Sequence, residues 1–229
     1  MDPEFDHLAK EYERLLDDPV REYFAPGSGF FLSRKIDVLL EFAARHGVNT
    51  TRATWLDVGC GKGELMRAVK PHVARVLGCD VSLGMMSECR DLDVVQQVDP
   101  DRLPYEDASV DWVTAVCVFH HIEPKDRDRL VADIHRALRP GGIFAIVEHN
   151  PLNPVTQWIV RRTPIDENAM LLTAGSSRRL LRSARLQIVA TRYFLYFPER
   201  IHKRAAPLER ALARVPLGGQ YVVFGRKIA

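Results

Sequence analysis

Residues 56–65 read Leu-Asp-Val-Gly-Cys-Gly-Lys-Gly-Glu-Leu and lie where an apolar, strand-like run passes into a helical pattern. The glycines at Gly59 and Gly61 permit a positive φ and carry no side chain, so the backbone can pass directly beneath a ligand. The helix that follows presents unpaired N–H groups and the positive end of its dipole to that ligand. This stretch predicts a ligand-binding turn between a strand and a helix of an α/β domain.

The acid within this turn, Asp57, indicates which of two kinds of cofactor the turn binds. Nicotinamide enzymes use a similar loop, usually spaced G-x-G-x-x-G, to hold a pyrophosphate. Here the spacing is Asp-x-Gly-x-Gly-x-Gly. A carboxylate repels a pyrophosphate and attracts an ammonium group. Asp57 therefore favours a cofactor that carries an amine, with a nicotinamide-dependent oxidoreductase as the alternative.

A second acid, Asp80, ends the next strand-like run and follows Asp57 by 23 residues. A carboxylate at the end of the second strand can accept hydrogen bonds from both hydroxyls of a ribose. At this interval from the glycine loop, Asp80 is predicted to bind the ribose of a nucleoside cofactor.

Apolar runs of strand length alternate with helical patterns in the middle of the chain. Strands are predicted at 53–58, 75–80, 93–98, 111–116 and 143–148, and helices at about 64–69, 84–89 and 125–138. Before them come a helix at about 5–16, a loop at 24–30 and a second helix that stops at Gly47. After Asn150 come a loop-rich stretch to about 174, a basic helix at 176–185 and strands at 186–197 and 220–226. The alternation predicts a parallel sheet with helices on both faces.

Composition is consistent with one globular domain of 229 residues, with 46% hydrophobic and 27% charged residues. No apolar run approaches the ~20 residues of a membrane-spanning helix, and no secretory signal pattern is visible. The four cysteines have no metal-ligand spacing, so we expect reduced thiols, no metal site and a cytoplasmic protein. Within the single domain 1–229, residues 1–46 are expected to form a helical lid and residues 150–175 an insertion over the acceptor.

Positive charge is concentrated in the last third of the chain. The net charge is only +2, but from Arg161 onward there are 14 Lys and Arg residues against 4 Asp and Glu. Such an excess suggests an anionic substrate, a nucleic acid or an acidic surface as partner, and a solvated basic face is the plain alternative.

Three further motifs follow the two acids in a fixed order. Residues 98–113 read VDPDRLPYEDASVDWV, residues 119–121 read FHH and residues 138–142 read LRPGG. Together they resemble class I S-adenosylmethionine (SAM)-dependent methyltransferases, in particular the broad ubiquinone/menaquinone C-methyltransferase-like group (methyltransferase type 11). The pattern there reads like D-x-x-x-L-P-F-x-D-x-S-F-D-x-V, then H-H and L-x-P-G-G. The match covers about residues 53–150.

The resemblance implies a Rossmann-like seven-stranded sheet in the order 3-2-1-4-5-7-6, with the last strand antiparallel and helices on both faces. It implies SAM as cofactor, with Asp57 near the methionine amine, Asp80 on the ribose and Asp99 on the adenine amino group. Leu103, Val116 and Cys117 would wall the ligand. The predicted cofactor-binding set is Asp57, Gly59, Cys60, Gly61, Asp80, Val81, Asp99, Leu103, Val116 and Lys35.

Two of these assignments depend on local features. The residue after the adenine-contacting acid usually donates its backbone N–H to the ring, but Pro100 has none. The donor would then come from Asp101 or Arg102, or the adenine is held less fully. The segment from Phe24 to Lys35 is expected to cover the sulfonium and carboxylate, and Ser33, Arg34 and Lys35 are candidates to pair with the methionine carboxylate.

The histidines follow the strands that should meet the acceptor. Ligands of such sheets sit at the carboxyl ends of the strands, where His120 and His121 follow the fourth strand and His149 ends the fifth. A neutral imidazole can take a proton from an attacking hydroxyl or amine. We predict His149 and His121 as catalytic bases, His149 being preferred because it adjoins the variable lid, and His120 as a packing residue.

The sequence is compatible with several chemical classes of methyl acceptor. Direct displacement of the methyl group needs positioning rather than a covalent intermediate or a metal. A small molecule is expected, with an anionic one favoured if Arg161 or Arg162 binds it and Trp158 stacks on a ring. RNA is the alternative acceptor and suits the basic C-terminal part. However, the chain has neither an Asn/Asp-Pro-Pro-aromatic motif nor an RNA-binding module. The attacked atom (O, N or C) and the oligomeric state are not predicted.

Overall fold

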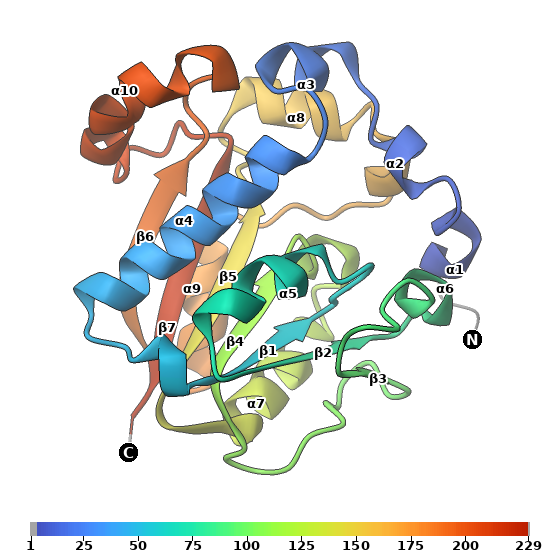
Figure 1. Ribbon diagram of the computed structural model, residues 1–229, viewed down its shortest axis with the longest axis vertical. Coiled ribbons are helices and arrows are strands. Elements are labelled where there is room, and N and C mark those ends of the chain that lie inside the picture. Colours follow the sequence, from blue (N-terminus) through green and yellow to red (C-terminus); the bar gives the residue numbers. More distant parts are fainter. Residues whose placement is uncertain (1–3, 229) are drawn as a thin grey trace.

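The computed structural model describes residues 4–228, which form a sheet with helices on both sides (Figure 1). The strands are β1 (Thr54–Val58), β2 (Arg75–Asp80), β3 (Val94–Gln96), β4 (Val110–Val116), β5 (Leu138–His149), β6 (Leu186–Phe194) and β7 (Gln220–Lys227). The α-helices are α1 (Glu4–Leu8), α2 (Tyr12–Leu15), α3 (Pro19–Phe24), α4 (Gly29–Arg45), α5 (Glu64–Val69), α6 (Leu83–Met86), α7 (Arg127–Ala137), α8 (Pro154–Val160), α9 (Ala174–Ser183) and α10 (Glu199–Leu212). Short 3₁₀ turns are η1 (Thr50–Arg52), η2 (Lys70–His72), η3 (Phe119–His121) and η4 (Pro164–Asp166).

The seven strands pair in the order β3-β2-β1-β4-β5-β7-β6. Strands β1 to β5 pair in parallel, and β7 is antiparallel to both of its neighbours, β5 and β6. The predicted Rossmann-like sheet, with its order and its antiparallel last strand, is therefore confirmed. The carboxyl ends of β1, β2, β4 and β5 meet at one edge, which is where a ligand binds in such sheets.

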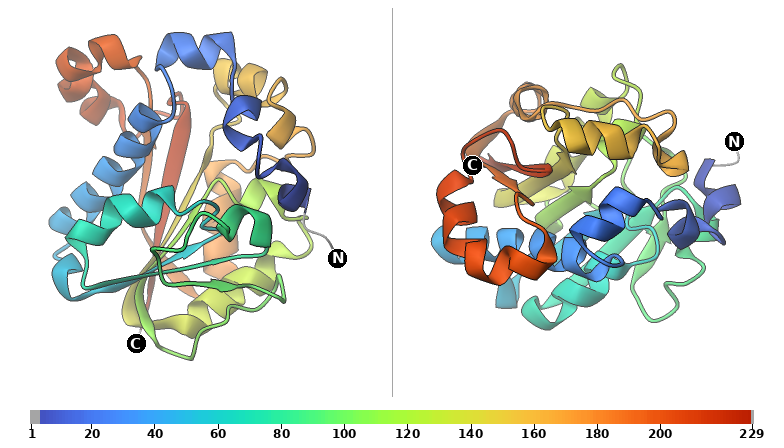
Figure 2. Two further views of the ribbon diagram at one scale, coloured as in Figure 1. Left: turned by 45° about the vertical axis from the view of Figure 1, so that its right-hand side comes forward. Right: turned by 90° about the horizontal axis from the view of Figure 1, so that it is seen from above.

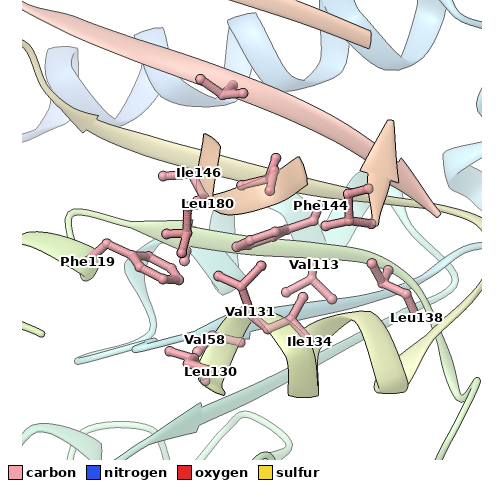
Figure 3. Packing of buried hydrophobic residues seen from close by; sticks show 14 of the residues in the cluster. Val58, Val113, Phe119, Leu130, Val131, Ile134, Leu138, Phe144, Ile146 and Leu180 are labelled. Carbon is pink, nitrogen blue, oxygen red and sulfur yellow. The ribbon is translucent and has the colours of Figure 1, made fainter. Parts of the chain in front are cut away.

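Two hydrophobic cores hold the helices on the sheet. On one face α4 and α5 cover a core in which Phe42 stacks on Phe224 with ring centroids 3.7 Å apart. On the other face α7 and α9 cover a core built from Val113, Phe144 and Leu180 (Figure 3). These positions are fully or almost fully buried, and burial of such side chains contributes about 1.5–3 kcal/mol each. The site is therefore built on a well-packed sheet.

The N-terminal segment differs from the predicted helix over 5–16. It breaks into α1 and α2, and a third helix, α3, follows before the loop at residues 25–28. The start of α3 has a local cause: Asp18 caps the backbone N–H groups of Val20 and Arg21, and Pro19 occupies the first turn. The sequence predicts a lid over residues 1–46. Helix α4 packs on the sheet, so a lid stays a prediction for the residues that precede α4.

Helices α3, α8 and α10 lie at the carboxyl end of the sheet, around the site (Figure 2, right). Helix α8 follows β5 and lies within the stretch predicted as an insertion, and α10 follows β6. No helix in residues 4–228 is long and apolar enough to cross a lipid bilayer.

Candidate functional site

The glycine loop after β1 has the backbone shape that its sequence predicts. Gly59, Gly61 and Gly63 have φ values of 68°, 52° and 75°, a region that favours glycine. A Cβ added at Gly59 would lie 2.5 Å from Val118 Cγ2, and one at Gly63 would lie 2.3 Å from Leu92 Cδ1. The backbone N–H groups of Gly59 and Cys60 donate to the carbonyl of Cys79, which joins the loop to β2.

Asp80 lies at the end of β2 against this loop. Its Oδ2 accepts the backbone N–H of Gly61 at 2.8 Å, and its Oδ1 accepts that of Ser82 at 2.9 Å. Burial raises the pKa of Asp80, and these hydrogen bonds act against the rise. A carboxylate has about four acceptor positions, so Asp80 keeps lone pairs for the two ribose hydroxyls that it is predicted to bind.

Asp57 is buried under the loop, where Thr114 Oγ1 donates to its Oδ1 at 2.7 Å. Burial is the main reason that the pKa of Asp57 is raised to about 7. The charge of Asp80 adds to the rise, whereas the hydrogen bond from Thr114 and the charge of Lys35 act against it. A carboxyl in this state gains from a cation placed beside it. This electrostatic setting fits the predicted position of the methionine amine.

Ser33, Arg34 and Lys35 are the three residues predicted to pair with the methionine carboxylate, and Lys35 is the one whose side chain is not bonded elsewhere in residues 4–228. Its charge lowers the pKa of Asp57 and of Cys117, so it lies close to the ends of both β1 and β4. No ion pair involves Lys35 among residues 4–228. Arg34 instead bonds Asp37 at 2.7 Å and Glu209 at 2.8 Å, and the Ser33 hydroxyl donates to the carbonyl of Phe30.

The other predicted cofactor residues lie around this loop with different exposures. Asp99 is exposed, and its Oδ1 accepts the backbone N–H of Asp101. Leu103 is 2% exposed and belongs to the hydrophobic core that α7 and α9 cover. Val81, directly after Asp80, and Val116, at the end of β4, are half-buried. It stays a prediction that Asp99 binds the adenine amino group and that Leu103, Val81 and Val116 contact the cofactor.

A buried ionic bridge joins the ends of β4 and β5 to the predicted acceptor lid. His120 Nδ1 lies 2.5 Å from Glu148 Oε2, and its Nε2 lies 3.3 Å from Asp166 Oδ1. Burial lowers the pKa of His120, but the two carboxylates outweigh it and raise the pKa well above its usual value. His120 is therefore an imidazolium that holds Asp166, and with it η4, against the sheet.

His121 lies beside this bridge in a different protonation state. Its Nε2 is 3.6 Å from Asp166 Oδ1, and the edge of the Phe5 ring is packed on it with centroids 4.9 Å apart. Burial and the positive charge of His120 lower the pKa of His121 to about 4. At neutral pH His121 is a neutral imidazole that can accept a proton.

His149 forms a pair with Cys117 instead. The His149 Nδ1 lies 3.5 Å from Gln220 Nε2, which also donates to Cys117 Sγ at 3.6 Å. Burial lowers the pKa of His149, but the charge of Cys117 and a hydrogen bond to it produce a net rise. Burial raises the pKa of the Cys117 thiol, while Lys35 and His149 bring it below its usual range. His149 therefore has a higher proton affinity than His121, and a larger fraction of it is already protonated at neutral pH.

The fold also assembles a set of groups that the sequence did not connect. Ligand atoms of His120, His121 and Asp166 lie within 4.8 Å of one another, close enough to hold a metal ion. The expectation of no metal site stays a prediction. Both ring nitrogens of His120 already have carboxylate partners, so hydrogen bonds and charge account for the cluster without an ion.

The N-terminal segment contributes residues that the sequence analysis did not single out. Asp6 Oδ1 accepts the backbone N–H of Gly84 at 2.7 Å and also a bond from the Ser82 hydroxyl, next to Asp80. The Tyr12 phenol is buried, and burial with the nearby charges of Cys117 and Asp166 raises its pKa. Contacts between residues this far apart in the chain leave no local pattern in the sequence.

Residues 56–146 match the model of a protein family described as a methyltransferase domain. This part of the chain is similar to a methyltransferase domain. The predicted resemblance to class I SAM-dependent methyltransferases is thereby confirmed at the level of this domain, whose limits agree with the 53–150 inferred from the motifs.

Curated relatives are similar to part of the chain. An uncharacterized methyltransferase of Synechocystis sp. is 31% identical over 103 residues, which are 43% of this chain and 48% of that protein. A demethylmenaquinone methyltransferase of Symbiobacterium thermophilum is 32% identical over 105 residues, 41% of each protein. The chain thus spans less than half the length of these curated relatives.

Solved structures resemble a larger part of the chain. A SAM-dependent methyltransferase from Archaeoglobus fulgidus superposes with a TM-score of 0.63 and 17% identity, over 87% of this chain and 100% of that one. This likeness concerns the fold, and it includes the elements outside the matched family region.

Proposed function

We propose that the protein is a SAM-dependent methyltransferase that transfers a methyl group to a small-molecule acceptor by direct displacement. The observation that carries the proposal is the meeting of the glycine loop and Asp80 with His121 at one edge of the sheet. The loop and the two acids suit a nucleoside cofactor with an amine, and the histidine suits an acceptor that loses a proton.

The described residues would divide the binding of SAM between them. Asp80 would accept from the ribose, Asp57 would face the methionine amine and Lys35 would pair with the carboxylate. Gly59, Cys60 and Gly61 would pass beneath the ligand, and Asp99, Leu103, Val81 and Val116 would surround the adenosine. When bound, SAM supplies the methyl group on its sulfonium. Positioning of the acceptor on the line of displacement supplies much of the rate.

We propose His121 rather than His149 as the general base for an O- or N-acceptor. This proposal differs from the order expected from sequence. It is supported by the pair of His149 with Cys117, which raises the pKa of His149 and with it the protonated fraction. His121 has a lowered pKa, so it is unprotonated over the whole neutral range. A carbon acceptor would need less help from either residue.

An anionic acceptor is supported by the arginines after α8. Arg161 is exposed and bonds the Gln157 side chain at 3.4 Å, while Arg162 Nε bonds Asp18 at 3.1 Å and lies over the Trp158 ring. Arg161 is thus the freer of the two to pair with a carboxylate or phosphate. If it does so, the apparent affinity for the acceptor falls as salt rises, and the affinity for the cofactor falls less.

Transfer of label tests the function directly. The protein is incubated with methyl-labelled SAM and fractionated metabolite extract, and in parallel with mixed RNA, and the product that gains label is identified. A labelled small molecule supports the proposal, whereas label in RNA would favour the RNA alternative. Binding of NADH but not of S-adenosylhomocysteine would favour the alternative of a nicotinamide-dependent oxidoreductase.

A further inference from the structure

Exposed apolar side chains gather at the carboxyl end of the sheet, on α3, α8, α10 and the turns beside them. Large apolar side chains there are each 44–66% exposed: Tyr23, Leu152, Val155, Trp158, Ile201, Leu208 and Leu217. We call these residues the apolar rim. Exposed aliphatic and aromatic side chains gathered on one surface mark an interaction site more often than scattered ones do.

Bonds between the elements make the rim one continuous surface. Arg162 of the turn after α8 bonds Asp18 at the start of α3. Arg200 of α10 bonds the Tyr23 hydroxyl of α3 and lies over its ring. The Asn153 side chain at the start of α8 donates to the carbonyl of Leu217. Figure 2 (right) looks onto this end of the molecule and shows the three helices around it.

Helix α10 is turned so that its apolar and basic residues face outward. Glu209 is buried, and it bonds Arg34 of α4 and the backbone N–H of Tyr196. Ile201 and Leu208 lie seven residues apart, on one face of the helix. That face is exposed, so it has no partner in residues 4–228.

Basic residues accompany the rim. Seven exposed Arg and Lys residues lie in the same segments: Arg161, Arg162, Arg200, Lys203, Arg204, Arg210 and Arg214. Within residues 199–219, all of which are described, Glu199 is the one exposed acid. Other exposed acids near these segments are Asp17, Glu22, Asp37 and Glu167, so basic residues remain in excess.

We propose that this end of the protein docks on the surface of a lipid bilayer that contains anionic lipids. A helix that lies in a bilayer interface combines basic residues with exposed Trp and Leu in this way, and its binding depends on apolar area together with attraction to anionic headgroups. The apolar rim fits a bilayer better than RNA, whose phosphate backbone attracts charge alone. Docking would bring the end of the protein that holds His121 and the glycine loop to the membrane surface.

Vesicle binding tests this proposal on the full chain. The protein is sedimented with vesicles of phosphatidylcholine alone and with vesicles that contain phosphatidylglycerol, at low and high salt. We expect binding to the anionic vesicles only, weakened by salt. Trp55 and Trp112 are fully buried whereas Trp158 is 45% exposed, so a blue shift of tryptophan fluorescence on binding reports on Trp158.

Matched variants separate this surface from charge in general. K203E/R204E on α10 should weaken vesicle binding at least tenfold, since each basic residue near an anionic surface contributes about a fivefold change. The control R52E/K70E changes charge equally in η1 and η2, at the amino ends of β1 and β2, and should bind as the wild type does. I201S/L208S should lower binding without a change in net charge. Circular dichroism and thermal melts establish that each variant is folded.

Several outcomes would overturn the proposal. They are the absence of binding to anionic vesicles, equal losses in K203E/R204E and in R52E/K70E, and a fluorescence spectrum unchanged by bound vesicles. Burial of the rim in a dimer, detected as a monomer produced by I201S/L208S in sedimentation velocity, would assign the surface to a second copy instead. Methyl transfer in the absence of vesicles is measured separately, so failure of docking leaves the proposed function untouched.

Discussion

The backbone N–H of Gly61 donates to Asp80 Oδ2 across 2.8 Å, which ties the glycine loop of β1 to the end of β2. One carboxylate therefore shapes the loop, and it is the group that we propose to bind the ribose. Since Asp80 also accepts from Ser82, it holds both sides of the turn where a nucleoside would lie.

Asp80→Ala should weaken binding of S-adenosylhomocysteine by about 1–3 kcal/mol, because the ribose hydroxyls lose their acceptor and Gly61 loses its partner. Titration calorimetry measures the change. Asp107→Ala is a matched control, since Asp107 pairs with Arg136 on the surface, and it should bind normally. Unchanged affinity in Asp80→Ala would remove this residue from the site.

Lys35→Met should weaken S-adenosylhomocysteine binding by about 1.5–3 kcal/mol if the ammonium pairs with the ligand carboxylate. Methylthioadenosine, which has no amino acid part, should bind the variant and the wild type almost equally. Lys62→Met is the control, because Lys62 lies in the glycine loop and already pairs with Glu88 at 2.9 Å. Equal losses for both ligands would mean that Lys35 acts on the fold and not on the carboxylate.

The motifs predicted the fold well because they record local requirements. Glycines that need a positive φ, acids that end strands and apolar runs of strand length are each read from a few neighbouring residues. The His120–Asp166 contact spans 46 positions, and the break between α1 and α2 depends on contacts such as Phe5 with His121. Such pairings are set by tertiary packing, so the different surroundings of His121 and His149 could not be predicted from sequence.

His121→Ala should lower kcat by about 10²–10⁴-fold for an O- or N-acceptor and leave binding of S-adenosylhomocysteine nearly intact. His149→Ala should have a smaller effect, because His149 is held by Cys117. Turnover assays with the acceptor found by label transfer measure kcat for each of the two variants. Wild-type turnover in the two variants would assign proton removal to solvent or to a carbon acceptor.

The pH profile distinguishes the two histidines independently. A base is active when unprotonated, so kcat falls as the pH drops through its pKa. If His121 is the base, the fall comes near the pKa of about 4 and kcat is level through neutrality. If His149 is the base, the fall comes above the ordinary value of about 6.5, since its pKa is raised. A profile of kcat from pH 4 to 9 that falls near 7 would contradict the assignment to His121.

Asp166→Asn should destabilise the protein at neutral pH by about 1–3 kcal/mol, because His120 loses a charged partner. Burial raises the pKa of Asp166, but His120 and the other histidines outweigh it and lower the pKa. A depressed carboxyl pKa stabilises the folded state above the unfolded pKa of about 3.9 and loses that effect as pH falls. The difference in Tm between variant and wild type should therefore shrink below about pH 4.

The neighbouring Glu167→Gln is the control for this experiment, since Glu167 is exposed. It should leave the Tm unchanged at every pH. A constant difference between Asp166→Asn and the wild type over the whole range would show that Asp166 acts through packing instead of charge.

Calorimetric titration of S-adenosylhomocysteine into the wild type and Gly61→Val tests the central claim most directly. Gly61 has a φ of 52°, and a Cβ there would lie 3.3 Å from Met85 Cε, so valine strains the loop that we propose to pass beneath the ligand. We predict binding of one molecule per chain to the wild type, no measurable binding to a folded Gly61→Val, and no binding of NADH to either. A folded Gly61→Val that binds S-adenosylhomocysteine as tightly as the wild type would contradict the account.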